Sequence, residues 1–225
     1  MAYLQDKFGS TGATNTIAIT LTGVTAGSTL VFFVDIQDPA VSATITVSDS
    51  VNGALAQTSN GYFTAASRVM AIFTIANVSA GSHTVTGTLG ASATLSKDAF
   101  LVECSAPVSS VIDGTPTFVF TTPVSTATDA IAANPVTTTV DGSTILSFCV
   151  DSLGATFVPG TGYTNSKTGI STANGDSVNV EHQTQNAAGS VTATWTDKIN
   201  GGGDSYAVWE IAIKAPQTLM GQAWT

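Results

Sequence analysis

Short segments of alternating apolar and polar residues recur about every 8 to 14 residues along the chain, with turn-forming residues between them. A period of two is typical of strands that bury one face, and this spacing is typical of a β-sandwich or barrel. The pattern predicts strands at residues 16–22, 29–36, 44–48, 69–75, 84–89, 98–104, 116–121, 135–139, 144–150, 177–183, 190–196 and 207–213.

Glycine and asparagine mark the expected turns, because both residues accept a positive φ. The turns are predicted at Ala26-Gly27, Asn52-Gly53, Asn60-Gly61, Ala80-Gly81, Asp141-Gly142, Asn174-Gly175 and residues 201–203. A short helix is expected only at residues 124–133, between Pro123 and Pro135. We therefore expect an all-β, antiparallel β-sandwich of the jelly-roll or immunoglobulin-like type.

A weak internal repeat divides the chain. Residues 20–35 resemble 137–151, residues 80–86 resemble 188–194, and residues 100–103 resemble 207–210, at a separation of about 107 to 115 residues. The repeat predicts two halves, which form either separate sandwiches or interleaved parts of one sandwich. The expected divisions are an N-terminal arm at 1–13, a first half at 14–107, a connection at 108–134, a second half at 135–216 and a C-terminal tail at 217–225.

Charge is scarce, at 9% of the residues, and the formal net charge is −9. Only six residues are Lys or Arg and they are spread along the chain, so nucleic acid and anionic membranes are not expected partners. No apolar run reaches the roughly 18 residues that a membrane-spanning helix needs. Residues 1–7 lack the apolar core of a signal peptide, so we expect a protein that stays in the cytoplasm until it is assembled or released.

Two cysteines, Cys104 and Cys149, lie in apolar strand segments. Unpaired cysteine behaves as a small apolar residue, so buried free thiols are expected, and a disulfide is the alternative.

Motifs of nucleophilic catalysis and of nucleotide binding are missing from the sequence, including Gly-x-Ser-x-Gly, the P-loop and the dinucleotide fingerprint. His83 and His182 lack the spacing of a metal-ligand pair and are expected to be structural. Glu103 and Glu210 occupy matching places in the repeat. They are either an acid pair that lines a cleft, as in enzymes that cleave glycans, or acids bonded to backbone and hydroxyl groups. We favour the second interpretation and predict no enzyme activity.

Loop acids offer oxygen ligands of the kind that Ca²⁺ prefers. The candidates are Asp35 with Asp38, and Asp176 with Asp204, but they show no EF-hand spacing. No metal or other cofactor is therefore predicted.

Apolar side chains at both ends of the chain fall outside the strand pattern. A chain end gains little from such groups unless a surface buries them. We expect either a strap across the protein's own body or contact with a neighbouring subunit, which makes these residues candidate partner-binding positions: Tyr3, Leu4, Phe8, Leu219, Met220 and Trp224. The loop aromatics Tyr62, Phe63 and Tyr163 either stack on sugars or cap the sandwich core.

The sequence resembles the β-sandwich proteins of tailed-bacteriophage virions, such as capsid decoration (cement) proteins and tail or fibre modules. The resemblance is carried by the Met-initiated polar segment, the strand opening at residues 24–31, the Ala-Gly-Ser turns before Thr/Val-rich strands and the closing residues 207–214. It implies a non-enzymatic virion protein that binds an assembled shell in many copies. The partner would be the major capsid protein or another virion component, with self-association, and the location would be the virion. A carbohydrate-binding or adhesion module of a tail fibre or bacterial surface protein is the alternative.

Overall fold

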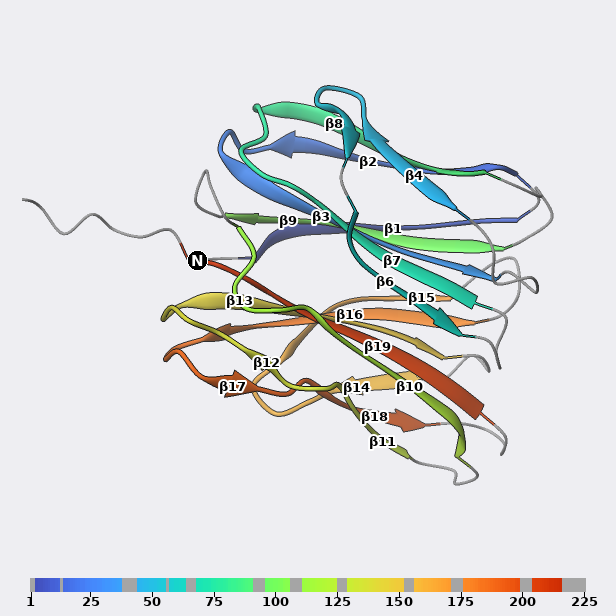
Figure 1. Ribbon diagram of the computed structural model, residues 1–225, viewed down its shortest axis with the longest axis vertical. Coiled ribbons are helices and arrows are strands. Elements are labelled where there is room, and N and C mark those ends of the chain that lie inside the picture. Colours follow the sequence, from blue (N-terminus) through green and yellow to red (C-terminus); the bar gives the residue numbers. More distant parts are fainter. Residues whose placement is uncertain are drawn as a thin grey trace, which may run out of the picture.

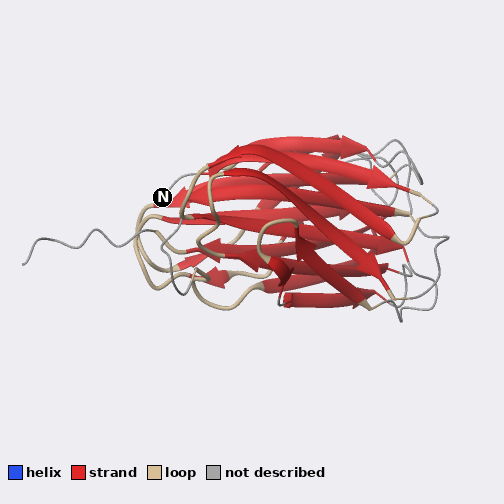
Figure 2. Ribbon diagram, turned by 90° about the horizontal axis from the view of Figure 1, so that it is seen from above, coloured by secondary structure: helices blue, strands red, loops and turns tan. Residues whose placement is uncertain are grey.

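The computed structural model describes residues 3–12, 14–37, 44–55, 57–63, 68–90, 96–105, 111–124, 129–151, 156–170, 176–198 and 204–215. Every named element in these residues is a strand, and the paired strands run antiparallel (Figure 1, Figure 2). The predicted all-β fold is confirmed, with several sheets packed face to face as in a β-sandwich.

The first half of the chain forms two facing sheets. Sheet A has the strand order β1-β9-β3-β7-β6, and sheet B has the order β2-β8-β4-β5. The strands are β1 (Tyr3–Thr11), β2 (Thr16–Val24), β3 (Ser28–Gln37), β4 (Ile45–Asp49), β5 (Gly53–Leu55), β6 (Gln57–Phe63), β7 (Arg68–Ile75), β8 (Gly81–Leu89) and β9 (Lys97–Ser105).

The second half also forms a large sheet faced by smaller ones. Sheet C has the order β10-β19-β13-β16-β15, sheet D has β11-β18-β14, and sheet E is the pair β12-β17. The strands are β10 (Thr117–Val124), β11 (Asp129–Ala132), β12 (Val136–Thr137), β13 (Ser143–Asp151), β14 (Thr156–Pro159), β15 (Thr164–Ile170), β16 (Ser177–Gln185), β17 (Ser190–Val191), β18 (Thr194–Lys198) and β19 (Asp204–Ile213).

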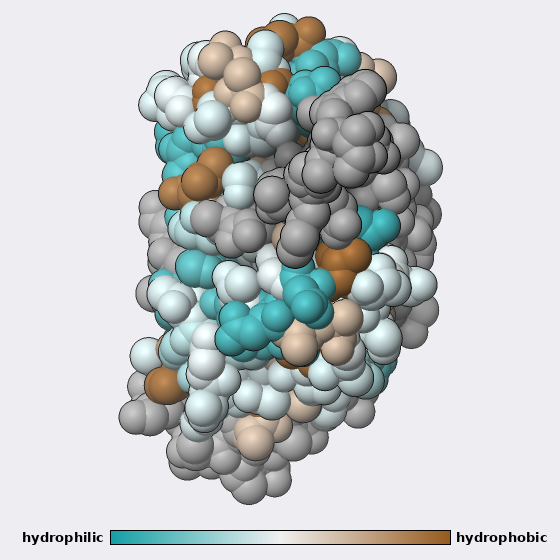
Figure 3. All heavy atoms as spheres, turned by 90° about the vertical axis from the view of Figure 1, so that its left-hand side faces the viewer, coloured by the Kyte–Doolittle hydropathy of each residue, from teal (hydrophilic) through white to brown (hydrophobic). Residues whose placement is uncertain are grey.

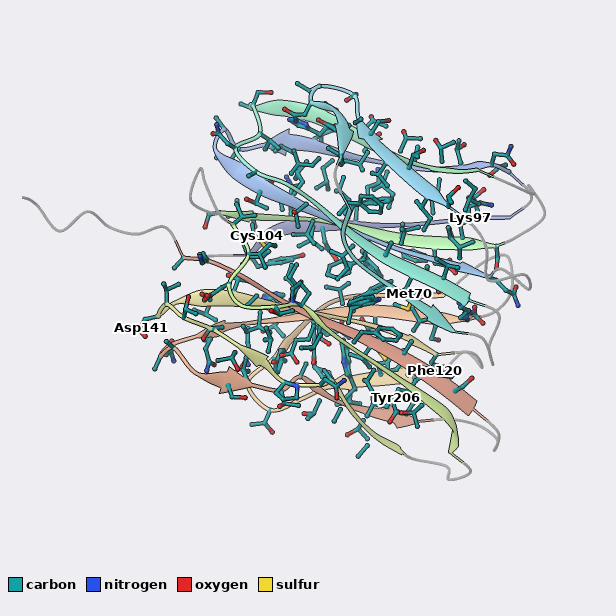
Figure 4. All side chains as sticks on the ribbon, in the orientation of Figure 1. Met70, Lys97, Cys104, Phe120, Asp141 and Tyr206 are labelled. Atoms are coloured by element: carbon teal, nitrogen blue, oxygen red, sulfur yellow. The ribbon has the colours of Figure 1, made fainter. Side chains whose placement is uncertain are left out.

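The sheets stack in four layers, with B outermost, then A, then C, then D and E together (Figure 1). We call the apolar core between sheets A and C the seam. Met70 and Cys104 belong to it (Figure 4), and the rings of Phe33 and Phe148 stack across it with centroids 4.9 Å apart. Because sheets A and C are covered on both faces, every residue of β13 is buried.

Sheets A and C have the same construction. When only the five strands of each sheet are counted along the chain, both sheets have the order first, fifth, second, fourth, third. Phe8 of β1 packs on Phe100 of β9 at 5.1 Å and 46°, and Phe118 of β10 packs on Trp209 of β19 at 4.7 Å and 46°. The duplication of the sequence itself stays a prediction, but the two large sheets share one topology.

The expected N-terminal arm is wrong for Tyr3–Thr11, which form edge strand β1 paired with β9. The two faces of β1 both pack against other sheets, so its sequence does not show the alternation of apolar and polar residues that predicts a strand. Phe8 joins the seam, whereas an ideal Cβ on Gly9 would lie 3.2 Å from Ile19 of sheet B. Strands β10 and β11 also form within residues 108–134, the expected connection.

Three local expectations are corrected. The predicted helix at 124–133 contains strand β11, which pairs with β18, and Asn60-Gly61 lies inside strand β6 instead of a turn. The strand predicted at 190–196 divides into β17 and β18. The division lies opposite Pro135, which has no N–H to donate to a ladder.

Candidate functional site

Three aspartates meet in the seam beside one arginine. Asp35 comes from β3, Asp98 from β9, and Asp176 directly precedes β16, and one carboxylate oxygen of each lies within 4.8 Å of the others. The guanidinium of Arg68, at the start of β7, forms ion pairs with Asp35 and Asp176. All four residues are 5% exposed or less. We call this group the seam cluster.

The seam cluster unites two acids that the sequence analysis assigns to separate calcium candidates, Asp35 and Asp176. The side chains of their expected partners, Asp38 and Asp204, lie outside the described residues. Asp98 is not among the candidates predicted from the sequence. Strand register would find it, because Asp98 stands directly opposite Asp35 on β9.

The seam cluster combines three carboxyl groups with one guanidinium. Burial raises the pKa of Asp35, and the positive charge of Arg68 acts in the opposite direction. Buried charge must be balanced by partners, protons or a cation, and Arg68 supplies part of this balance. The oxygens fit a hard cation such as Ca²⁺ in kind, but the cluster already contains a cationic side chain of its own.

A second polar group, which we call the inner acid pair, lies inside the second half. It consists of Glu181 of β16 and Glu210 of β19, both fully buried and both directly opposite Ser147 of β13. The Gly160 N–H donates to Glu181 Oε2 at 3.1 Å. The Ala193 N–H lies 3.2 Å from both carboxylate oxygens of Glu210. Each glutamate therefore bonds a backbone amide at an end of sheet D.

Two aromatic side chains complete this group. The Tyr163 hydroxyl donates to Glu210 Oε1 at 3.3 Å, and Trp195 Nε1 donates to Ser147 Oγ at 3.2 Å. Burial raises the pKa of each glutamate to about 8, and the negative charge of Glu210 adds to the effect on Glu181. Burial and both glutamates also raise the pKa of Tyr163. The inner acid pair is therefore protonated at neutral pH.

The expected equivalence of Glu103 and Glu210 is wrong. Glu103 stands opposite Leu30 in sheet A and is 1% exposed. Its carboxylate accepts hydrogen bonds from the Thr25 N–H at 2.8 Å and from Ser28 Oγ at 2.7 Å, which fixes the turn before β3. The favoured interpretation of Glu103, an acid bonded to backbone and hydroxyl groups, is confirmed, and it lines no cleft with Glu210.

Asp113 performs the same task in the second half, although it is not among the candidates predicted from the sequence. Its carboxylate accepts from the Thr139 N–H at 2.8 Å, from Thr139 Oγ1 at 2.6 Å and from Ser143 Oγ at 2.6 Å. Burial acts to raise the pKa of Asp113, but the hydrogen bonds of Ser143 and Thr139 together lower it. The turn before β13 is therefore held by an ionised side chain.

The histidines and cysteines have structural positions, as expected. His83 is buried, with Nδ1 3.0 Å from Asp49 Oδ2 and Nε2 2.9 Å from the Ser79 carbonyl oxygen. Cys104 and Cys149 are buried free thiols, which confirms that prediction. Burial and the charge of Glu103 raise the pKa of Cys104 to about 12, so this thiol is a poor nucleophile.

The predicted partner-binding residues at the N-terminus are largely used within the chain. Tyr3 stacks on His182 with ring centroids 4.0 Å apart, and Phe8 packs on Phe100. Leu4 is 41% exposed and remains available to a partner. The other candidates, Leu219, Met220 and Trp224, lie outside the described residues.

On the side shown in Figure 3, the hydrophobic residues of the described part of the chain occur as small separate groups. No helix in the described part of the chain is long and apolar enough to cross a membrane. No known family model matches this chain, and a search of curated proteins finds no matching sequence.

Proposed function

We propose that this protein is a non-enzymatic structural component that binds a repeating assembly, as a capsid decoration protein of a tailed-phage virion does. The observation that carries the proposal is where the charges lie. The chain has six Lys or Arg and fifteen Asp or Glu residues, and among the residues whose side chains the structure describes, eleven of these are buried. In the described part of the chain, the fold uses most of its charges internally, and the exposed positions are mainly threonine, serine and glycine.

Such a surface suits a lattice contact. Charged side chains are depleted at the centres of protein interfaces, because their desolvation opposes binding. Threonine and serine lose less side-chain entropy than lysine or glutamate when an interface orders them. Two of the six basic residues, Arg68 and Lys97, are themselves buried, which weakens any attraction to phosphate groups.

The four-layer stack supports the same proposal. The seam joins both halves through one apolar cluster, so the two large sheets are packed together as one body. A stiff body binds a lattice without an entropy cost for ordering its own parts. Glu103 and Asp113 hold turns, and Glu181 and Glu210 bond backbone amides at the end of sheet D. These contacts favour a structural role over catalysis.

Quantitative mass spectrometry of purified virions from the source of this gene tests the proposal. The expected result is a copy number comparable with that of the major capsid protein or a fixed fraction of it. Absence from the particle would overturn the proposal. Retention of the free protein on a glycan array would instead support the alternative, a carbohydrate-binding or adhesion module.

A further inference from the structure

The polarity of the inner acid pair is not required by the fold. Sheets A and C each have a row of three residues paired across three neighbouring strands. The middle residue of the row directly precedes the phenylalanine that stacks across the seam, Phe33 in sheet A and Phe148 in sheet C. In sheet A the row is Phe73, Phe32 and Leu101. In sheet C the row is Glu181, Ser147 and Glu210. The same layer of the same topology is therefore apolar in one half and acidic in the other.

One part of this difference is a packing exchange. Phe32 of β3 fills the space beside Gly87 of β8, where an ideal Cβ would lie 3.4 Å from Phe32 Cε1. In the second half the large ring comes from the opposite layer, because Trp195 of β18 packs on Ser147. This exchange explains the serine. It does not explain why glutamates flank it.

Buried polar atoms beside the glutamates lack hydrogen-bond partners. Asn179 is fully buried, and both its Oδ1 and Nδ2 are without a partner in the structure, as is Glu181 Oε1. Asn179 is two residues before Glu181 on β16, so both side chains point to the same face of sheet C. Unsatisfied groups of this kind indicate a bound water or ion that completes their bonding.

The two carboxyl groups converge on one place. Glu181 bonds the N–H of Gly160, and Glu210 bonds the N–H of Ala193. Gly160 lies against the backbone of Thr194, the residue after Ala193, because an ideal Cβ on Gly160 would meet the Thr194 carbonyl oxygen. The glutamates therefore reach adjacent points at the end of sheet D, beneath Tyr163.

We propose that Glu181, Glu210 and Asn179 bind a divalent cation of the Ca²⁺ type inside the second half. Carboxylate, amide and hydroxyl oxygens are the ligands that such a cation prefers, and Ser147 supplies a hydroxyl between the glutamates. In the described part of the chain, no basic side chain is among the partners of either glutamate. The seam cluster differs, because Arg68 already occupies it. The ion would replace two protons and leave the site neutral.

Trp195 makes the site measurable in the full-length protein. Tb³⁺ takes the place of Ca²⁺ in oxygen sites and emits when a nearby tryptophan is excited. We expect Tb³⁺ emission from the metal-free protein, its displacement by Ca²⁺, and direct Ca²⁺ binding by calorimetry. The Trp195→Phe variant should lose most of the emission and keep its Ca²⁺ affinity. Failure of the wild-type protein to bind Ca²⁺ or Tb³⁺ at millimolar concentration would overturn the proposal.

The decisive variant is Glu181→Gln with Glu210→Gln, because glutamine has the shape of a protonated glutamate and should preserve the fold. It should weaken Ca²⁺ binding by about 100-fold or more. Asn179→Ala is a second test that keeps both acids, with an expected loss of roughly 10-fold. The matched control is Asp35→Asn in the seam cluster, which should leave the affinity unchanged. Binding that survives the glutamine changes and is lost in Asp35→Asn would assign the ion to the seam cluster and refute the proposal.

Discussion

Truncation of Phe148 tests whether the two halves form one cooperative body. This residue is fully buried in the seam, where its ring stacks on Phe33 at 4.9 Å and meets Phe100 edge-on at 5.9 Å. Phe→Ala changes in close-packed cores cost about 3 to 5 kcal/mol. At roughly 2 to 4 °C per kcal/mol for a chain of this length, the Phe148→Ala variant should unfold roughly 6 to 20 °C below the wild-type protein.

The assay is thermal and urea unfolding, followed by tryptophan fluorescence and circular dichroism. A single shared transition that moves as a whole is the expected result, because the seam contains residues from both halves. Val158→Ala is the control, since this side chain is 41% exposed and should shift stability by about 0.5 kcal/mol or less. A double-mutant cycle with Phe33→Ala should give a coupling of about 0.5 to 1.5 kcal/mol. Two separate transitions, of which only one responds to Phe148→Ala, would refute the reasoning.

Three further predictions concern buried ionisable groups. Burial raises the pKa of Glu181 and Glu210 from 4.5 to about 8, so between these pH values the folded chain holds more protons than the unfolded chain. The stability of the fold should therefore fall as pH rises through this window, and urea midpoints measured between pH 5 and 8 give the slope. Changing both residues to Gln should flatten the slope. Asp113→Ala should cost about 1 to 3 kcal/mol at pH 7. Because the pKa of Asp113 is lowered in the folded state, the difference from wild type should shrink as pH falls below 3.8, and a difference that persists there would contradict an ionic role. Cys104 and Cys149 should react with a thiol reagent only when the protein unfolds; labelling of the native protein at the unfolded rate would contradict their burial.

Strand periodicity predicts the sandwich well where one face is apolar, but it fails where both faces are in contact. β1 is missed because Phe8 faces the seam while Gly9 faces sheet B. Its residues therefore do not alternate between apolar and polar. β11 is mistaken for a helix because Asp129–Ala132 is too short to show a period. These errors arise from sheet stacking, which no local pattern records.

The candidate sites are less predictable than the fold. Asp35, Asp176 and Glu210 are recognised from the sequence as acids with a possible function, but Asp35 and Asp176 are not grouped together, and Glu210 is matched with Glu103 instead of Glu181. Asp98 and Glu181 become visible only when strand register places them beside these acids. A charged residue in a strand is normally expected to face solvent, so sequence alone gives no reason to group acids inside a core.

The large ring lies on the large sheet in the first half, where Phe32 faces Gly87, and on the covering sheet in the second half, where Trp195 faces Ser147. This difference also bears on how the chain folds. Two halves with one topology can mispair, because an outer sheet of one half can collapse on the large sheet of the other before the seam forms. Sheet D on sheet A would press the Trp195 ring against Phe32, and sheet B on sheet C would leave Gly87 above Ser147 with an empty space. Each large sheet thus accepts only its own cover. The opposite placement of one large ring in each half gives the chain a steric means to tell its correct assembly from the swapped one.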